Sequence, residues 1–99
     1  MIQGSTPTHT FTLPIKVESI DKIRIVYAQN DKVLFVKNKE DCTLDGNCVS
    51  VKLSQENTLS LMSYKICVIQ IRVLTVGGDS LVSNPISVPV EKCYDKEVL

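Results

Sequence analysis

Apolar and polar residues alternate along almost the whole of this chain. In residues 11–17 apolar side chains occupy every second position, interrupted by Pro14, and the same alternation recurs in residues 23–27. A period of two places successive side chains on opposite faces of a strand, whereas a helix needs a period of about 3.6 residues. Only residues 55–57 could form a single helical turn. The alternation therefore predicts an all-β chain.

Turn-forming residues separate the alternating stretches. Asn30-Asp31 and Asp45-Gly46 are typical of tight hairpin turns, and Gly77-Gly78-Asp79 indicates a third turn. Strands are expected at residues 11–17, 23–27, 33–37, around 43, 49–53, 64–76 and 81–90. Short strands at this spacing are typical of a two-layer sandwich or a small barrel.

The length and composition fit one domain. The chain has 99 residues, of which 43% are hydrophobic and 22% charged, which is enough apolar material for a single core. We predict one immunoglobulin-like antiparallel β-sandwich of about seven strands, spanning residues 1–99, with residues 1–7 and 94–99 as extended or flexible tails. Pro85 and Pro89 lack amide donors, so the last strand is expected at a sheet edge.

Residues that could carry catalysis are sparse. His9 is the only histidine, and no nucleophile or acid nearby would orient it, so we expect an exposed residue of a strand edge. The chain contains no Gly-rich phosphate loop, no His-Glu-x-x-His motif and no nucleophile elbow. The sequence predicts a protein that is not an enzyme and binds no cofactor.

The four cysteines, Cys42, Cys48, Cys67 and Cys93, are predicted to be free thiols. Their spacing differs from the paired knuckles of structural zinc sites, so no metal site is expected. A turn at Asp45-Gly46 would put Cys42 and Cys48 on opposite faces of a hairpin, where they cannot form a disulfide. The first residues lack the basic and apolar regions of a signal peptide, so we expect synthesis in a reducing cytoplasm.

Charge and hydropathy bear on partners. Eleven basic residues balance eleven acidic ones, which predicts neither nucleic-acid nor membrane binding. The longest apolar runs, such as Ile66–Ile69, are far shorter than the roughly 20 residues of a membrane helix. An oligonucleotide-binding barrel is the alternative fold, but it would need aromatic platforms, and the chain has only three tyrosines and two phenylalanines.

Two short runs are apolar on both faces of their predicted strands. A sandwich strand should have one wet face, yet Val33–Val36 and Ile66–Ile69 have none. Either loops cover these runs or another subunit does. The candidate interface residues are Val33, Leu34, Phe35, Val36, Ile66 and Val68.

Several stretches resemble small immunoglobulin-like structural proteins of tailed phages and Firmicute prophages, and are similar to the N-terminal domain of upper baseplate proteins. These stretches are residues 23–30 (IRIVYAQN), 53–59 (LSQENTL), 69–73 (IQIRV), 83–88 (SNPISV) and 95–99 (DKEVL). The resemblance implies a virion component, made in the cytoplasm of a bacterial host, whose partners are other virion structural proteins or further copies of itself. It implies no catalytic residues.

A ligand- or carbohydrate-binding accessory domain on the same scaffold is the alternative function. Such a domain would be expected to expose aromatic side chains beside a cleft.

Overall fold

The computed structural model describes all residues 1–99. It contains eight strands, one short α-helix and two single turns of 3₁₀ helix. The strands are β1 (Thr8–Thr12), β2 (Ile20–Gln29), β3 (Lys32–Asn38), β4 (Cys42–Asp45), β5 (Cys48–Lys52), β6 (Ile66–Thr75), β7 (Ser80–Val82) and β8 (Ile86–Pro89); the helix is α1 (Gln55–Leu59), and the 3₁₀ turns are Val17–Ser19 and Lys39–Asp41.

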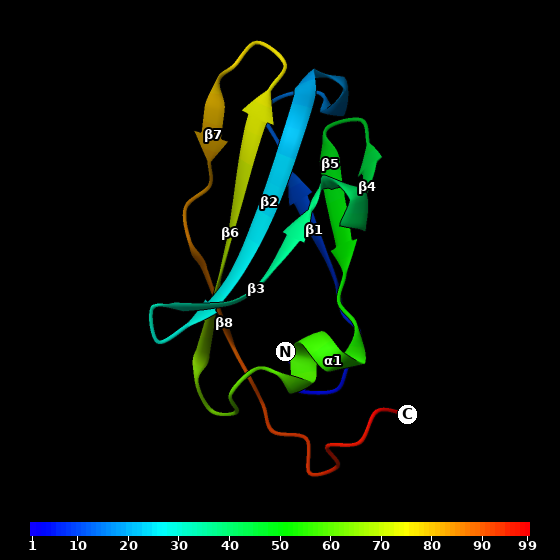
Figure 1. The fold of residues 1–99 in the computed structure, drawn as a ribbon, viewed down its shortest axis with the longest axis vertical. Helices are drawn as coiled ribbons and strands as arrows, with labels where there is room; N and C mark the ends of the chain where they lie inside the picture. The colour runs from blue at the N-terminus through cyan, green and yellow to red at the C-terminus, as the bar shows by residue number, and fades with distance from the viewer.

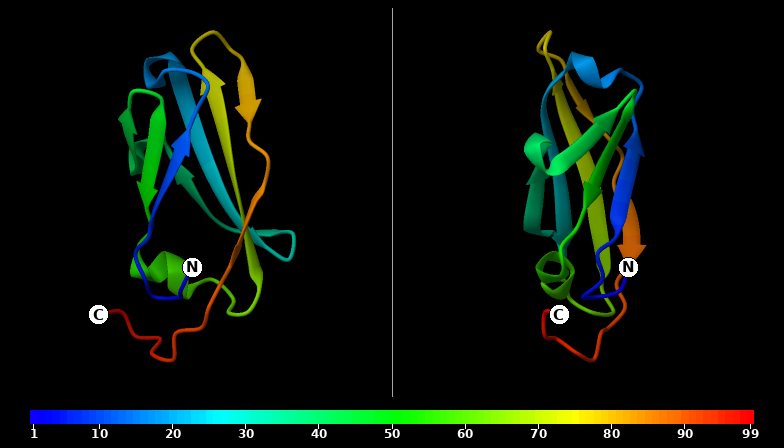
Figure 2. Two further views of the ribbon diagram at one scale, coloured as in Figure 1. Left: turned by 180° about the vertical axis from the view of Figure 1, so that it is seen from behind. Right: turned by 90° about the vertical axis from the view of Figure 1, so that its right-hand side faces the viewer.

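The strands form two antiparallel sheets that pack face to face. One has three strands in the order β1-β5-β4, and the other has the order β3-β2-β6-β7, with β8 also paired to β6. Figure 1 looks onto the five-stranded sheet, with β1 behind it, and the views in Figure 2 show the two layers from the rear and from the side. The prediction of an all-β antiparallel sandwich is confirmed.

The strand order is that of an immunoglobulin-like sandwich without its first strand. In that plan strands B, E and D share one sheet, and C′, C, F and G share the other. Here β1, β5 and β4 occupy the places of strands B, E and D. In the other sheet β3, β2 and β6 occupy the places of C′, C and F, and β7 and β8 together occupy the place of G. Strand A, which would flank β1, has no counterpart.

The central strands β2 and β6 supply most of the core. Every second residue of each points to the three-stranded sheet, which buries Ile23, Ile25 and Tyr27 from β2. β6 is in register with β2, so its buried residues lie opposite these, with Ile25 facing Ile71 and Tyr27 facing Ile69. Ile20 of β2 and Cys67 and Val73 of β6 also belong to the core. The remaining core residues are Val49 and Val51 of β5, Leu53 and Leu61 on either side of α1, and Val90 directly after β8.

One predicted hairpin turn is confirmed and another is shifted. Asn30 and Asp31 both have positive φ, 52° and 60°, as the two-residue turn between β2 and β3 requires. Between β4 and β5, Asp45 pairs with Cys48, so the turn residues are Gly46 and Asn47, and the prediction of Asp45-Gly46 was wrong by one position. Gly46 therefore occupies the first turn position, with a φ of 60°.

The final predicted strand is divided in two, which accounts for eight strands rather than seven. β7 and β8 both pair with β6 on the side away from β2, but the ladder breaks at residues 83–85. There the Ser83 hydroxyl accepts a hydrogen bond from the Ile71 amide. Pro85 cannot donate to a ladder, so the break falls beside it. β8 forms a ladder with β6 only, as expected for a proline-containing edge strand, and on its other side the Met1 ammonium donates to the Pro89 carbonyl at 2.9 Å.

The segments at both chain ends contact the end of the sandwich near α1. Gln3 is buried and donates to the Leu61 carbonyl at 2.6 Å, while its side-chain oxygen accepts from the Cys93 amide at 3.1 Å. Ile2 forms an isolated bridge with Glu91. Helix α1 begins with Ser54, whose hydroxyl accepts from the Asn57 amide and caps the helix.

Candidate functional site

The face of the five-stranded sheet that points away from β1, β5 and β4 is uncovered, and we call it the outer face. Its centre is apolar because Ala28 lies between Val33 and Val68 in neighbouring strands, and Val26 lies beside Val36. We call this set the apolar patch: Val26, Ala28, Val33, Val36, Ile66 and Val68. Val33 is 53% exposed and Ile66 is 52% exposed. Exposed apolar side chains grouped in this way indicate a surface for protein contact.

The six predicted interface residues divide between the two faces of the sheet. Val33, Val36, Ile66 and Val68 lie on the outer face, as the register with β2 and β8 shows. Leu34 and Phe35 instead pack against the core. The cause is a register shift opposite Tyr27 and Ala28, where Phe35 pairs with Tyr27, Val33 pairs with Ala28, and Leu34 is the extra residue.

Sequence reasoning missed two members of the patch, Val26 and Ala28. Both share the parity of Arg24 in a strand whose opposite parity is Ile23, Ile25 and Tyr27. That parity alone could have placed them on the outer face. Both belong to the four-residue apolar run Ile25–Ala28, which the alternation in residues 23–27 assigned to a strand with a single buried face.

A basic cluster lies beside the apolar patch on the same face. Arg24 of β2 pairs directly with Arg72 of β6, and Lys22 lies two pairs further along, opposite Leu74, at the next position on the same face. No paired outer-face position of the sheet carries a carboxylate. Like charges placed opposite each other in a sheet are destabilising, so the folded chain gains nothing from this arrangement on its own. The outer face is thus apolar at one end and positively charged at the other.

His9 lies on the edge strand β1, as the sequence predicted, but it is not exposed. It is half-buried, its Nδ1 lies 2.7 Å from the Tyr27 hydroxyl, and its ring stacks on the Tyr27 ring at a centroid distance of 5.7 Å. The Phe35 ring also stacks on the Tyr27 ring, at a centroid distance of 4.6 Å. Burial lowers the pKa of His9 and raises the pKa of Tyr27, so both groups are neutral at neutral pH. Because Tyr27 is fully buried, the pair ties β1 to β2 across the two layers and presents no hydroxyl to solvent.

All four cysteines are free. Cys42 pairs with Val51 and Cys48 pairs with Asp45, so these two side chains point to opposite faces of the β4–β5 hairpin despite the shifted turn. Burial raises the pKa of the Cys42 and Cys67 thiols. No group of three or more His, Cys, Asp or Glu side chains could hold a metal ion together.

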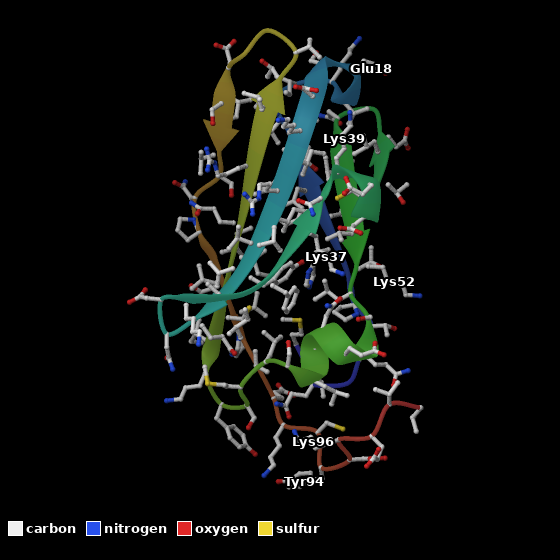
Figure 3. All side chains as sticks on the ribbon, viewed as in Figure 1. Glu18, Lys37, Lys39, Lys52, Tyr94 and Lys96 are labelled. Atoms are coloured by element: carbon white, nitrogen blue, oxygen red, sulfur yellow. The ribbon has the colours of Figure 1, made fainter.

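The exposed tyrosines do not flank a cleft. Tyr64 follows α1, and Tyr94 lies in the C-terminal segment, at the foot of the molecule in Figure 3. Lys92 places its Nζ 5.2 Å from the centroid of the Tyr94 ring. Neither tyrosine lines the largest groove of the molecule, so the arrangement expected of a carbohydrate-binding domain is not formed by these residues.

No helix of this structure has both the length and the hydropathy needed to cross a membrane. A scan against models of known protein families, a search of curated proteins and a search of solved structures each found no match.

Proposed function

We propose that this domain is a non-enzymatic structural or assembly module of a tailed phage or prophage, which acts by docking its outer face on another structural protein. The observation that carries the proposal is the apolar patch, which no part of the chain covers. The resemblance of the sequence to phage structural proteins supports the virion setting.

The charges of the outer face define the partner. The basic cluster of Lys22, Arg24 and Arg72 adjoins the patch, and a shallow hollow of about 280 Å³ lies among these three side chains, Leu74 and Ser80. A partner surface that buries the patch must place carboxylates over the cluster, because like or unpaired charges at an interface are costly. The expected partner therefore presents apolar side chains flanked by acidic ones.

The test is direct binding to the tail and baseplate proteins encoded in the same gene cluster. Val33→Glu adds a negative charge within the patch and should weaken docking by at least about tenfold, or about 1.4 kcal/mol. Thr43→Glu is the matched control, because Thr43 is exposed on β4 in the other sheet. The variants are compared by calorimetry and by co-purification after co-expression.

Two results would overturn the proposal. One is equal loss of binding in the Val33 and Thr43 variants, which would show that the outer face is not the contact surface. The other is a gene cluster whose structural proteins all fail to bind the wild-type domain.

A further inference from the structure

An apolar groove lies beside β1, on the side away from β5. Its volume is about 470 Å³, and Phe11 and Leu13 form one wall. Ile71, Leu81 and Ile86 of the facing sheet form the floor and the other wall. The rear view in Figure 2 shows β1 between β5 on one side and β7 on the other.

The floor of this groove is an interior surface that the sandwich leaves uncovered. Leu81 pairs with Val73, and Ile86 pairs with Ile69, so both point to the inner side of their sheet. Val73 and Ile69 are each 3% exposed, yet Leu81 is 37% exposed and Ile86 is 46% exposed. The three-stranded sheet therefore ends at β1 before it reaches β7 and β8, where strand A of the complete plan would lie.

The β1 wall presents unpaired backbone groups. The Leu13 amide donates to the Asn47 carbonyl, and the Leu53 amide donates to the Pro7 carbonyl, so the odd-numbered residues of this segment bond to β5. Backbone groups of an antiparallel strand point alternately to its two sides. The N–H and C=O groups of Thr8, Thr10 and Thr12 therefore point away from β5 and have no partner strand, and Thr10 and Thr12 line the groove.

β1 also lacks the features that protect the other sheet edges from strand addition. β3 carries Lys32, Lys37 and a bulge, β8 follows Pro85 and ends at Pro89, and β4 has only four residues. Charges, bulges, prolines and short length are the usual means of blocking an edge. β1 (THTFT) contains no charged residue, no bulge and no proline.

The groove is free of charge on both sides. Residues 1–15 and residues 80–90 contain no Asp, Glu, Lys or Arg, and these two segments supply β1 and the β7/β8 wall. A charged side chain that entered the groove would lose its hydration and find no counter-ion. The occupant must therefore be uncharged, with apolar side chains at every second position.

We propose that the groove receives an extended, uncharged segment of a partner chain, which pairs with the free edge of β1 as an added strand. Such a segment fills the place of strand A, satisfies the amides of Thr8, Thr10 and Thr12, and covers Leu81 and Ile86. The edge of this added segment that faces away from β1 must carry no further strands. The β1 strand of a second folded copy does not qualify, because its own facing sheet would enter the layer that β6, β7 and β8 already occupy.

The test uses the full chain and a capped synthetic seven-residue peptide in which threonine alternates with valine and isoleucine. Amide hydrogen exchange is followed by NMR with and without millimolar peptide. The amides of Thr8, Thr10 and Thr12 should exchange rapidly in the free protein and become at least about tenfold slower with peptide. The amides of His9 and Phe11, already bonded to β5, serve as internal references.

Three variants and one control peptide make the result decisive. Thr10→Pro removes a groove-facing donor and should abolish the protection, whereas Thr10→Val keeps the donor and should bind as wild type. Leu81→Lys places a charge on the groove wall opposite β1 and leaves the β1 sequence unchanged. This variant should also abolish the protection of the threonine amides by the peptide. A peptide of the same composition with its threonines grouped together should not bind.

Several results would overturn the proposal. These are protection of the Thr10 amide in the free protein, no added protection with peptide, equal binding of the grouped peptide, or wild-type binding by Leu81→Lys. Concentration-dependent protection without peptide would show that a second copy is the occupant instead. Because the outer face takes no part in this experiment, Val33→Glu should leave peptide binding unchanged, and the two proposals can fail separately.

Discussion

At the scale of single residues, the contact between His9 and Tyr27 joins the two layers through a polar group. His9 is half-buried, and burial lowers its pKa from the ordinary value of 6.5. The folded state therefore favours the neutral imidazole, and just below pH 6.5 the unfolded chain holds more protons than the folded chain. Stability supplied by this residue is fully present above that pH and is lost as the pH falls below it.

We expect the free energy of unfolding of the wild type to fall relative to that of His9→Gln as the pH is lowered from about 7.5 to about 5. Glutamine keeps a hydrogen-bonding side chain but does not titrate. Urea denaturation of both proteins across this range provides the measurement. A constant difference between the two proteins would mean that the histidine pKa is the same in the folded and unfolded chains.

The thiols give a second prediction at this scale. A thiol reagent should find four free thiols in the unfolded, non-reduced protein, and in the native protein Cys67 should react far more slowly than the rest. Cys67 is buried, and burial raises the pKa of its thiol, so little thiolate is available. The reaction of the Cys67→Ala variant with the reagent should lack the slow phase and keep the faster phases of the other three thiols. Two thiols in the unfolded protein would instead demonstrate a disulfide.

At the scale of elements, the edge strand β8 has two faces of very different tolerance. Val88 lies opposite the buried Cys67 and packs against the core, whereas Pro89 is exposed and lies opposite Ile66. Val88→Asp should cost about 2–4 kcal/mol, because it puts a charge without a partner against apolar side chains. Pro89→Thr should change stability by less than about 0.5 kcal/mol, since the new amide would point away from β6 at an exposed position where water can reach it, and the Pro89 carbonyl that accepts from the Met1 ammonium is retained. Similar denaturation midpoints for the two variants would mean that the faces are reversed.

Local signals in the sequence predicted most elements but not how they meet. The alternation located the cores of the strands after residue 20, and Asn30-Asp31 located its turn, because both depend on neighbouring residues. The first strand, expected at residues 11–17, is instead Thr8–Thr12, so the alternation placed it too far along the chain. The inward orientation of Leu34 depends on a bulge opposite Tyr27, and the His9–Tyr27 contact joins residues far apart in the chain. Neither has a periodic signature. The groove beside β1 arises from the lateral offset of two sheets, which no single strand encodes.

At the scale of the whole molecule, a net charge of zero conceals an uneven distribution. The positive charges of Lys22, Arg24 and Arg72 share the outer face with no carboxylate at the paired positions around them. Most acidic residues lie instead in turns and connections, such as Glu40 and Asp41 in the 3₁₀ turn after β3. A surface that holds repelling charges together in the free protein is the pattern expected where a partner later neutralises them.

Arg72→Glu should therefore stabilise the free domain, because it replaces the repulsion between Arg24 and Arg72 with a cross-strand attraction. The expected gain is roughly 0.2–1 kcal/mol at low ionic strength, and it should shrink as salt screens both interactions. Lys52→Glu is the control, since it makes the same change in net charge at an exposed position of β5 that faces the uncharged Thr8. Urea denaturation at low and high salt measures the difference, and the same Arg72 variant should dock more weakly on an acidic partner. A variant that is no more stable than the control at low salt would show that the two arginine side chains diverge in solution, and that the free domain holds no electrostatic strain for a partner to relieve.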